Sequence, residues 1–406
     1  MLPRDEAWSL LLPHLSPLPP TRLPRREARG RVLAEGVTAT VDVPSADVSA
    51  MDGYAFAGDH AAGARLKVAG RIAAGERPGR ELPEGAALKI MTGAPVPVGA
   101  DRVIPFELTD RGAETVEITR PVDAGANIRR CGEVMETGAP LLAPGAVLTA
   151  EALALLATHG VGELAVHPAP RVAVLTTGDE VLPPEATPEP GQLRDSHTDF
   201  LTAGCAALGV EARALGIAPD EPAELARRLA AGLDDSDVLL VGGGVSAGEL
   251  DYVEGTLADL GCRALFTSVA IQPGKPLTVA VRPAEEDEQG RQRLVFGLPG
   301  NPGSVMVTFH LFVRPALRRL MGHAAAAPHE RLQTGVLAGS SSRAKKRDLY
   351  LPARAEVRDG VLAVEPLAPR GSHDLLAHAR SNALLYLPAE SGEGRVGEAC
   401  QVLPLD

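Results

Sequence analysis

Aromatic side chains are scarce in this sequence: one Trp, four Tyr and seven Phe make up 3% of its 406 residues. Any core therefore has to be built from aliphatic side chains, and the hydrophobic fraction of 45% supplies them. Long apolar runs are also missing, and the N-terminus carries Asp5 and Glu6 where a secretory signal would be basic. The sequence thus predicts a globular protein of about two to four domains, with no membrane partner.

Cysteine is the next shortage. Cys131, Cys205, Cys262 and Cys400 lie far apart in the sequence and form no C-x-x-C pair of the kind that binds zinc. Isolated cysteines in a chain of this length predict reduced, mostly buried thiols and a cytoplasmic protein. Acidic residues outnumber basic residues, and the resulting formal net charge of −12 argues against nucleic acid as a partner.

The first 44 residues predict two helices and a strand. A short helix is expected over residues 6–12. A second is expected from Pro24, a favourable first helical position, to the residue before Gly36. Residues 38–43 alternate as a strand.

From residue 45 to 138, short β-type runs alternate with Gly, Pro and Asp, which is the spacing of a small all-β domain. The clearest runs are residues 66–68, 87–91, 102–106 and 115–118. A helix at 151–158 and a strand at 163–167 follow, and we expect them to rejoin the N-terminal elements. We therefore predict an elongated N-terminal domain made of residues 1–44 and 139–168, with a β domain inserted at 45–138.

Strands and helices alternate between residues 169 and 324, the pattern of a doubly wound α/β domain. The predicted strands are 172–175, 211–217, 237–241, 263–271 and 294–297, and the predicted helices are 199–208, 221–233, 252–259 and 303–321. From residue 325 to 406 the β texture returns with Gly-rich turns, which predicts a C-terminal β-barrel or sandwich.

The ends of these strands are the most informative about function. Residues 237–251, DVLLVGGGVSAGELD, run from a buried strand into three glycines, whose backbone N–H groups a ligand can approach closely. Taken alone, this stretch is equally well explained as a glycine-rich turn with capping residues. Three more tight loops lie at predicted strand ends: TTGDE at 176–180, QPGKP at 272–276 and GLPGNPGS at 297–304. Because open α/β sheets bind ligands at the carboxyl ends of their strands, the four loops together predict a binding site.

The loops carry four carboxylates and one cation. Asp179, Glu180, Glu249 and Asp251 lie there with Lys275, one of only five lysines in the chain. Glycine-rich N–H groups and helix N-termini attract a phosphate, whereas carboxylates repel it. Both features are compatible if Mg²⁺, with oxygen ligands, bridges them. These residues therefore predict a phosphate-bearing small molecule bound with Mg²⁺, without naming it.

Three polar motifs lie outside the α/β region: SAMDGYA at 49–55, MTGAPVP at 91–97 and RGSHD at 370–374. By themselves they are explained as a capped turn, a turn and ordinary loop polarity. Together with the four loops, in this order, they resemble the molybdenum-insertion enzymes of molybdenum-cofactor biosynthesis. That family comprises the bacterial molybdopterin molybdenumtransferases and the gephyrin E domain. The resemblance implies a four-domain homodimer that binds adenylylated molybdopterin, inserts molybdate and releases AMP in an Mg²⁺-dependent reaction.

The resemblance also implies roles for acidic residues and for two residues of the β domain. Glu180 and Asp251 would be the metal-binding and phosphate-side carboxylates, with Asp220 of the LGIAPDEP loop beside them. Asp52 and Thr92 would face the pocket from the β domain of the partner subunit.

A second implied group binds the substrates. Lys275, Pro276 and Ser304 would hold the oxyanion, with Ser372 reaching in from the last domain. The other residues expected to bind substrate are Gly243, Gly244, Ser246, Gly274, Pro299, Asn301 and Pro302.

The sequence departs from the family pattern in four places. Val134 follows Gly-Glu where an acidic residue is usual, and Pro352 stands where an arginine is expected. Gln272 and Ser268 take the places of lysines. The oxyanion site is therefore expected to be less positive than in relatives.

Two other functions remain open at this point. One is a scaffold or anchoring protein of the gephyrin type, and the other is a molybdopterin adenylyltransferase, which needs only the α/β domain. Other proteins of molybdenum-cofactor biosynthesis are candidate partners in addition to the small-molecule substrates.

Overall fold

The computed structural model describes residues 1–244, 252–287, 290–324 and 331–405. Contacts divide the chain into two compact units. Unit 1 comprises Met1–Leu23, Gly30–Ala34 and Ala165–Asp406, and unit 2 comprises Pro24–Arg29 and Glu35–Leu164. This division is coarser than the four predicted domains, whose boundaries stay a prediction. In the described part of the chain, no helix is both long and apolar enough to cross a membrane.

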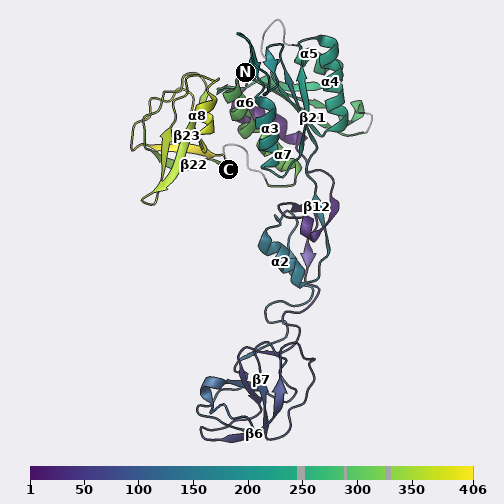
Figure 1. The fold of residues 1–406 in the computed structure, drawn as a ribbon, viewed down its shortest axis with the longest axis vertical. Coiled ribbons are helices and arrows are strands. Elements are labelled where there is room, and N and C mark those ends of the chain that lie inside the picture. The colour runs from purple at the N-terminus through teal and green to yellow at the C-terminus, as the bar shows by residue number, and fades with distance from the viewer. Residues whose placement is uncertain (245–251, 288–289, 325–330, 406) are drawn as a thin grey trace. The chain divides into compact units, whose positions relative to one another are not determined.

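A six-stranded mixed sheet forms the centre of unit 1, in the order β16-β13-β17-β21-β20-β18 (Figure 1). Its strands are β13 (Val172–Thr177), β16 (Ala212–Ala218), β17 (Val238–Gly242), β18 (Arg263–Ser268), β20 (Pro276–Arg282) and β21 (Arg293–Leu298). The first four in spatial order are parallel, whereas β20 runs antiparallel to both β21 and β18. The predicted α/β class is confirmed, with a reversed strand inside one edge of the sheet.

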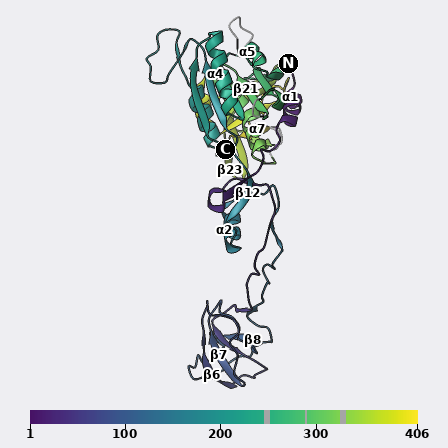
Figure 2. The same cartoon turned by 90° about the vertical axis from the view of Figure 1, so that its right-hand side faces the viewer.

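Helices cover both faces of this sheet, as Figure 1 and Figure 2 show. Its strands have small or apolar side chains at successive positions, so side chains point to both layers. Val172 and Val174 pack in one cluster with helices that include α1 (Arg4–Leu11) and α3 (His197–Ala206). Ala173 and Leu175 pack in the other cluster. The remaining helices are α4 (Pro222–Asp235) and α5 (Val253–Asp259) on that second face, and α6 (Pro302–Thr308), π-helical η5 (Phe309–Val313) and α7 (Arg314–Leu320) on the first.

A closed five-stranded barrel follows, in the order β23-β24-β22-β26-β25 with β25 paired back to β23. The strands are β22 (Gln333–Leu337), β23 (Asp348–Arg358), β24 (Val361–Pro366), β25 (Ala383–Leu387) and β26 (Ala399–Pro404). A two-residue strand, β19 (Ile271–Gln272), joins β23 in parallel. The predicted single strand over 263–271 is therefore wrong, because it ends at Ser268 and its last residue belongs to the barrel sheet.

The N-terminal helix ties the sheet to the barrel. Arg4 is 7% exposed, and its Nη1 donates a hydrogen bond to the Oη of Tyr350, 2.6 Å away. The same guanidinium lies over the ring of Tyr386, 5.0 Å from its centroid. On the other side of the helix start, Leu2 forms a β-bridge with Val269. These contacts join residues from the start, middle and end of the chain.

The predicted helix from Pro24 to Gly36 is wrong. That stretch holds β1 (Thr21–Pro24), the 3₁₀ turn η2 (Arg25–Glu27) and β2 (Val32–Leu33), with β1 and β2 flanking β12 (Glu163–His167) in a three-stranded sheet. Gly30 has φ +76°, a left-handed conformation that interrupts a helix. Val32 and Leu33 are buried at 0% and 1% exposure, so their tertiary packing outweighs the local helical pattern.

Unit 2 is built around a five-stranded sheet in the order β8-β5-β7-β6-β9. Its strands are β5 (Gly53–Phe56), β6 (Arg65–Ile72), β7 (Ala86–Ile90), β8 (Arg102–Pro105) and β9 (Thr115–Glu117). Tyr54 and Phe56 are buried in its core. The unit also holds the pairs β3 (Val37–Thr38) with β11 (Pro140–Leu142) and β4 (Val48–Ser49) with β10 (Ile128–Arg129), and the helix α2 (Ala150–Thr158). The predicted strand at 38–43 is thus confined to its first residue.

Candidate functional site

Two cavities of unit 1 lie at the carboxyl ends of the parallel strands and share Asn301. The acidic cavity, named for Glu180, Asp195 and Asp220 in its wall, has a volume of about 590 Å³. The basic cavity, named for Lys275, Arg343, Lys345 and Arg347, has a volume of about 580 Å³. The residues that the sequence predicted for a single site are therefore divided between two adjoining cavities, one lined by carboxylates and the other by cations.

Local backbone geometry opens the acidic cavity where β17 ends. Gly243 and Gly244 have φ of +100° and +68°, which a side chain would strain. A Cβ on Gly243 would lie 2.9 Å from the carbonyl oxygen of Thr177, and one on Gly244 would lie 2.8 Å from the Oγ1 of Thr177. The loops after β13 and β17 pack too closely for any residue but glycine. Both predicted glycines line the cavity.

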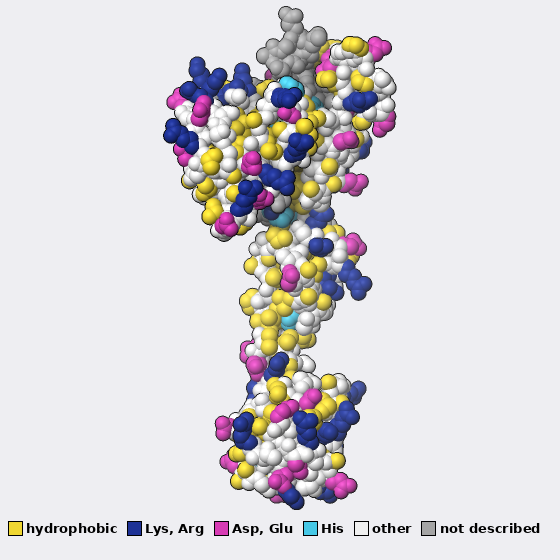
Figure 3. Space-filling model, turned by 60° about the vertical axis from the view of Figure 1, so that its left-hand side comes forward, with side chains coloured by type: hydrophobic (Ala, Val, Ile, Leu, Met, Phe, Trp, Pro, Cys, Tyr) yellow, Lys and Arg dark blue, Asp and Glu magenta, His cyan; other side chains and the backbone are white. Residues whose placement is uncertain are grey.

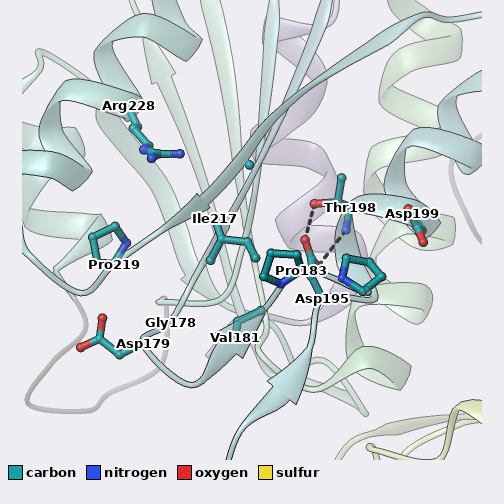
Figure 4. Close-up of a pocket in the computed structure, with 12 residues that line it drawn as sticks. Gly178, Asp179, Val181, Pro183, Asp195, Thr198, Asp199, Ile217, Pro219 and Arg228 are labelled. Atoms are coloured by element: carbon teal, nitrogen blue, oxygen red, sulfur yellow. Dashed lines mark hydrogen bonds between the residues drawn. The ribbon is translucent and has the colours of Figure 1, made fainter. Parts of the chain in front are cut away.

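The loops after β13 and β16 are fastened to one another by two aspartates. The backbone N–H of Asp220 donates to the Oδ1 of Asp179, 3.0 Å away, and the N–H of Asp179 reaches the Oδ2 of Asp220 at 3.4 Å. This pairing fixes the turn that carries Glu180, whose side chain is exposed and lines the acidic cavity. Asp179 instead lines a neighbouring cavity, together with Arg228 and Thr198 (Figure 4).

Asp195 is a buried carboxylate that the sequence analysis missed. It is 7% exposed and lies in the walls of both the acidic cavity and its neighbour. Its Oδ2 accepts from the Oγ1 of Thr198 at 2.6 Å, and its Oδ1 accepts from the N–H of Thr198 at 3.1 Å (Figure 4). The same Oδ1 also accepts from the N–H of His197 at 2.9 Å. It therefore holds the start of α3 in place. An Asp just before a predicted helix is the signal that identifies such a residue.

The basic cavity brings together a loop of the sheet and a segment of the barrel. Gly274, Lys275, Pro276 and Ser304 line it from the sheet side, and Ser372 lines it from the other. The carbonyl oxygen of Ser372 accepts a hydrogen bond from the N–H of Gly303 at 2.8 Å, which fastens the RGSHD loop to the start of α6.

The positive charge of the basic cavity does not come from Lys275 alone. Arg343, Lys345 and Arg347 line the basic cavity beside Lys275, although Gln272 is also in its wall. No Asp or Glu of the described residues lines it. Figure 3 shows acidic, basic and apolar side chains interspersed on one face of the molecule, so this concentration of one sign is a local property of the cavity.

The other residues discussed in the sequence analysis are divided among the wall of the acidic cavity, the protein interior and the part of the chain outside the described residues. His373, interpreted from sequence as ordinary loop polarity, lines the acidic cavity, as do Asn301 and Pro302. Pro299 is buried and lines neither cavity, so its expected contact with substrate has no support here. Ser246, Glu249 and Asp251 lie outside the described residues.

Asp52 and Thr92 of unit 2 are brought together as a pair. The Oδ1 of Asp52 accepts hydrogen bonds from the backbone N–H of Thr92 at 2.7 Å and from its Oγ1 at 2.8 Å. These two bonds lower the pKa of the Asp52 carboxyl below its ordinary value. Asp52 is exposed, so the pair presents an ionised carboxylate to solvent.

The acidic cavity has ligands suited to Mg²⁺. Among the described residues no group of three or more His, Cys, Asp or Glu side chains is placed to hold a metal ion. Mg²⁺ does not require such a cage, because it is commonly held by one or two carboxylates together with substrate phosphates and water. Glu180 and Asp220 supply hard oxygen ligands in one cavity, so the residues fit this ion.

Comparison with known proteins identifies the family. Three family models match in order: "MoeA N-terminal region (domain I and II)" at residues 2–160, "Probable molybdopterin binding domain" at 173–319 and "MoeA C-terminal region (domain IV)" at 334–405. A molybdopterin molybdenumtransferase of Synechococcus elongatus is 40% identical over 329 residues, covering 78% of this chain and 80% of its own.

Two further relatives span nearly the whole chain. Molybdopterin molybdenumtransferase 2 of Mycobacterium tuberculosis is 34% identical over 401 residues, which is 95% of each chain. The crystal structure of the molybdopterin biosynthesis MoeA protein of Pyrococcus horikoshii superposes with a TM-score of 0.82 at 28% identity, covering 100% of this chain and 99% of that one. This chain therefore belongs to the molybdopterin molybdenumtransferase family.

Proposed function

We propose that this chain inserts molybdenum from molybdate into adenylylated molybdopterin and releases AMP, with Mg²⁺ bound at the acidic cavity. Family membership makes it a transferase of molybdenum-cofactor biosynthesis. One observation carries the finer proposal: an acidic cavity and a basic cavity adjoin and share Asn301. Carboxylates that bind Mg²⁺ suit the phosphate of such a substrate, and the adjoining cations suit a separate oxyanion.

The residues of each cavity suggest their part in the reaction. Glu180 and Asp220, with Asp251 from outside the described residues, would hold Mg²⁺. The bound ion supplies positive charge that neutralises the phosphate oxygens of the adenylylated substrate. Gly243 and Gly244 line the same cavity, and their backbone would lie against the substrate. Lys275 and Ser304 hold molybdate in the basic cavity through charge and hydrogen bonds.

The function is tested by incubating the purified protein with adenylylated molybdopterin, molybdate and Mg²⁺, and by measuring AMP. Release of AMP should require all three. Glu180→Gln should raise the Mg²⁺ concentration needed roughly tenfold, because an amide binds the ion less well than a carboxylate. Asp251→Asn should act in the same direction.

Glu185→Gln is the matched control, because Glu185 is exposed and lines neither cavity. It should leave the Mg²⁺ requirement unchanged. Thermal denaturation should show all three variants as stable as the parent protein. An Mg²⁺ requirement that Glu180→Gln leaves unaltered would remove this carboxylate from the metal site.

We also propose that the chain acts as a homodimer in which each site takes Asp52 and Thr92 from the partner subunit. Support comes from the resemblance and from the paired, exposed Asp52 carboxylate. At an Mg²⁺ concentration too low to support the Glu180→Gln protein, mixing it with Asp52→Ala protein should restore about a quarter of the parental AMP release. About half of the exchanged dimers are hybrids, and each has one intact site.

The control for this mixture uses two changes on the same side of the site. Asp52→Ala mixed with Thr92→Val should restore nothing, since every site then lacks one of the paired residues. Subunit exchange is verified with two affinity tags. If exchanged Asp52→Ala and Glu180→Gln dimers stay as inactive as this control, the shared site is wrong.

A further inference from the structure

We propose that two side chains of the barrel, Arg343 and Lys345, determine the affinity of the basic cavity for its tetrahedral dianion, and that they replace the charge absent at Gln272. This inference rests on the proposed function for the identity of the anion. It assigns a role to a segment, residues 342–347, that connects two barrel strands and belongs to none of the sequence motifs.

Successive side chains of this segment point in opposite directions, which places Arg343 and Lys345 on the same side. Residues 342–345 have no helical or turn structure. Ala344 is 1% exposed and packs in the barrel core, so its neighbours Arg343 and Lys345 point the opposite way. Both are exposed and both line the basic cavity, whereas Lys346 is exposed and does not. The segment therefore presents its charges in a defined direction.

Hydrogen bonds hold the segment at both ends. The N–H of Ser341 donates to the carbonyl oxygen of Gly394 at 3.0 Å. The carbonyl oxygen of Lys345 accepts from the N–H of Glu390 at 2.6 Å. Close by, the Nη1 of Arg347 donates to the carbonyl oxygen of Ile271 at 3.1 Å, directly beside Gln272. Arg347 thus attaches the cationic segment to the loop in which Gln272 takes the place of a lysine.

The described residues do not neutralise the charge in the cavity. Lys275, Arg343, Lys345 and Arg347 line it, and no carboxylate of the described residues does. None of these four side chains forms an ion pair with a described residue. A dianion entering the cavity meets cations whose attraction is not already used in internal pairs, and the serines in the wall add hydrogen-bond donors.

The test measures binding of molybdate by titration calorimetry, separately from AMP release. Arg343→Gln and Lys345→Gln should each weaken binding about fivefold, the upper range for one partly exposed charge. The double variant should lose roughly tenfold or more, and adding Gln272→Lys to it should recover part of the loss. Tungstate should follow the same order, since it is also a tetrahedral dianion.

Lys346→Gln is the matched control, because it removes the same charge one residue away from the cavity wall. It should change molybdate binding by less than about twofold. Equal losses in Lys345→Gln and Lys346→Gln would show a general charge effect and overturn the proposal, as would no loss in the double variant. A parent protein that binds molybdate with this variant pattern but releases no AMP would refute the proposed function alone.

Discussion

Replacing Lys275 with alanine should raise the molybdate concentration needed for AMP release by roughly ten- to a hundredfold. A charged hydrogen bond is worth about 1.5–3 kcal/mol, which corresponds to that range. The loop holds this lysine firmly at the cavity: Gly274 has φ +106°, and a Cβ there would lie 2.8 Å from the Cγ2 of Thr308. The measurement is AMP release against molybdate concentration.

Lys67→Ala is the control for this prediction, because Lys67 is an exposed lysine of unit 2 on β6. It should leave the molybdate requirement unchanged. Gln272→Lys should lower the requirement, since it adds a cation to the wall of the same cavity. An unchanged requirement in Lys275→Ala would show that this loop does not bind the oxyanion.

Arg293→Met should destabilise unit 1 by about 3–5 kcal/mol, the usual cost of removing one partner from a buried ion pair. Arg293 is 1% exposed, and its Nε donates to the Oδ1 of Asp287 at 3.1 Å. Its Nη1 lies 3.5 Å from the Oδ1 of Asp237, which Arg171 also contacts at 3.0 Å. Methionine fills part of the volume but leaves two carboxylates without this charge.

This network lies at the start of β21, so AMP release per folded molecule should be unaffected. The measurement is denaturant unfolding at neutral pH. The control is Arg213→Met, which removes an exposed ion pair with Asp235 and should cost less than about 1 kcal/mol. If Arg293→Met also lowers the free energy of unfolding by less than about 1 kcal/mol, the buried ion pairs contribute little to stability.

The stability that this network provides should depend on pH. Burial raises the pKa of the Asp287 carboxyl, but the hydrogen bond from the backbone N–H of Arg291 and the charge and hydrogen bond of the Arg293 guanidinium more than offset it, so the pKa is lowered. A carboxyl with a lowered pKa stabilises the fold above its unfolded pKa, and the contribution is lost as the pH falls through the folded value. The difference between Arg293→Met and its parent should therefore shrink in acid.

Local sequence predicted the elements whose pattern and packing agree. The strand at 163–167 has the predicted bounds, and the alternation of 172–175 is that of a strand packed on both faces. Local sequence did not predict the elements whose structure depends on pairing with strands far away in the chain. Val32 and Leu33 pair with β12, and Ile271 leaves the central sheet for the barrel. Neither pairing leaves a local periodic signal.

The candidate site also combines residues that local sequence identified with residues that only the fold brings together. Glycine and proline after buried strands identified the loops that carry Glu180, Gly243 and Lys275, because tight turns require those residue types. Arg343 and Lys345 gave no such signal, since an extended segment brings them from the barrel to a loop about 70 residues earlier in the chain. The role of a charged side chain on such a segment can be recognised only when the fold is known.

The bond between Arg4 and Tyr350 has a consequence for synthesis of the protein on the ribosome. The two residues are 346 positions apart, so α1 has been synthesised long before Tyr350 is added to the chain. Ala7, Trp8 and Leu11, which are buried in the finished core, are likewise made before the residues that cover them, among them Phe312, whose ring centroid lies 6.5 Å from that of Trp8. The apolar face of α1 therefore cannot be buried as in the finished core until Phe312 has been made.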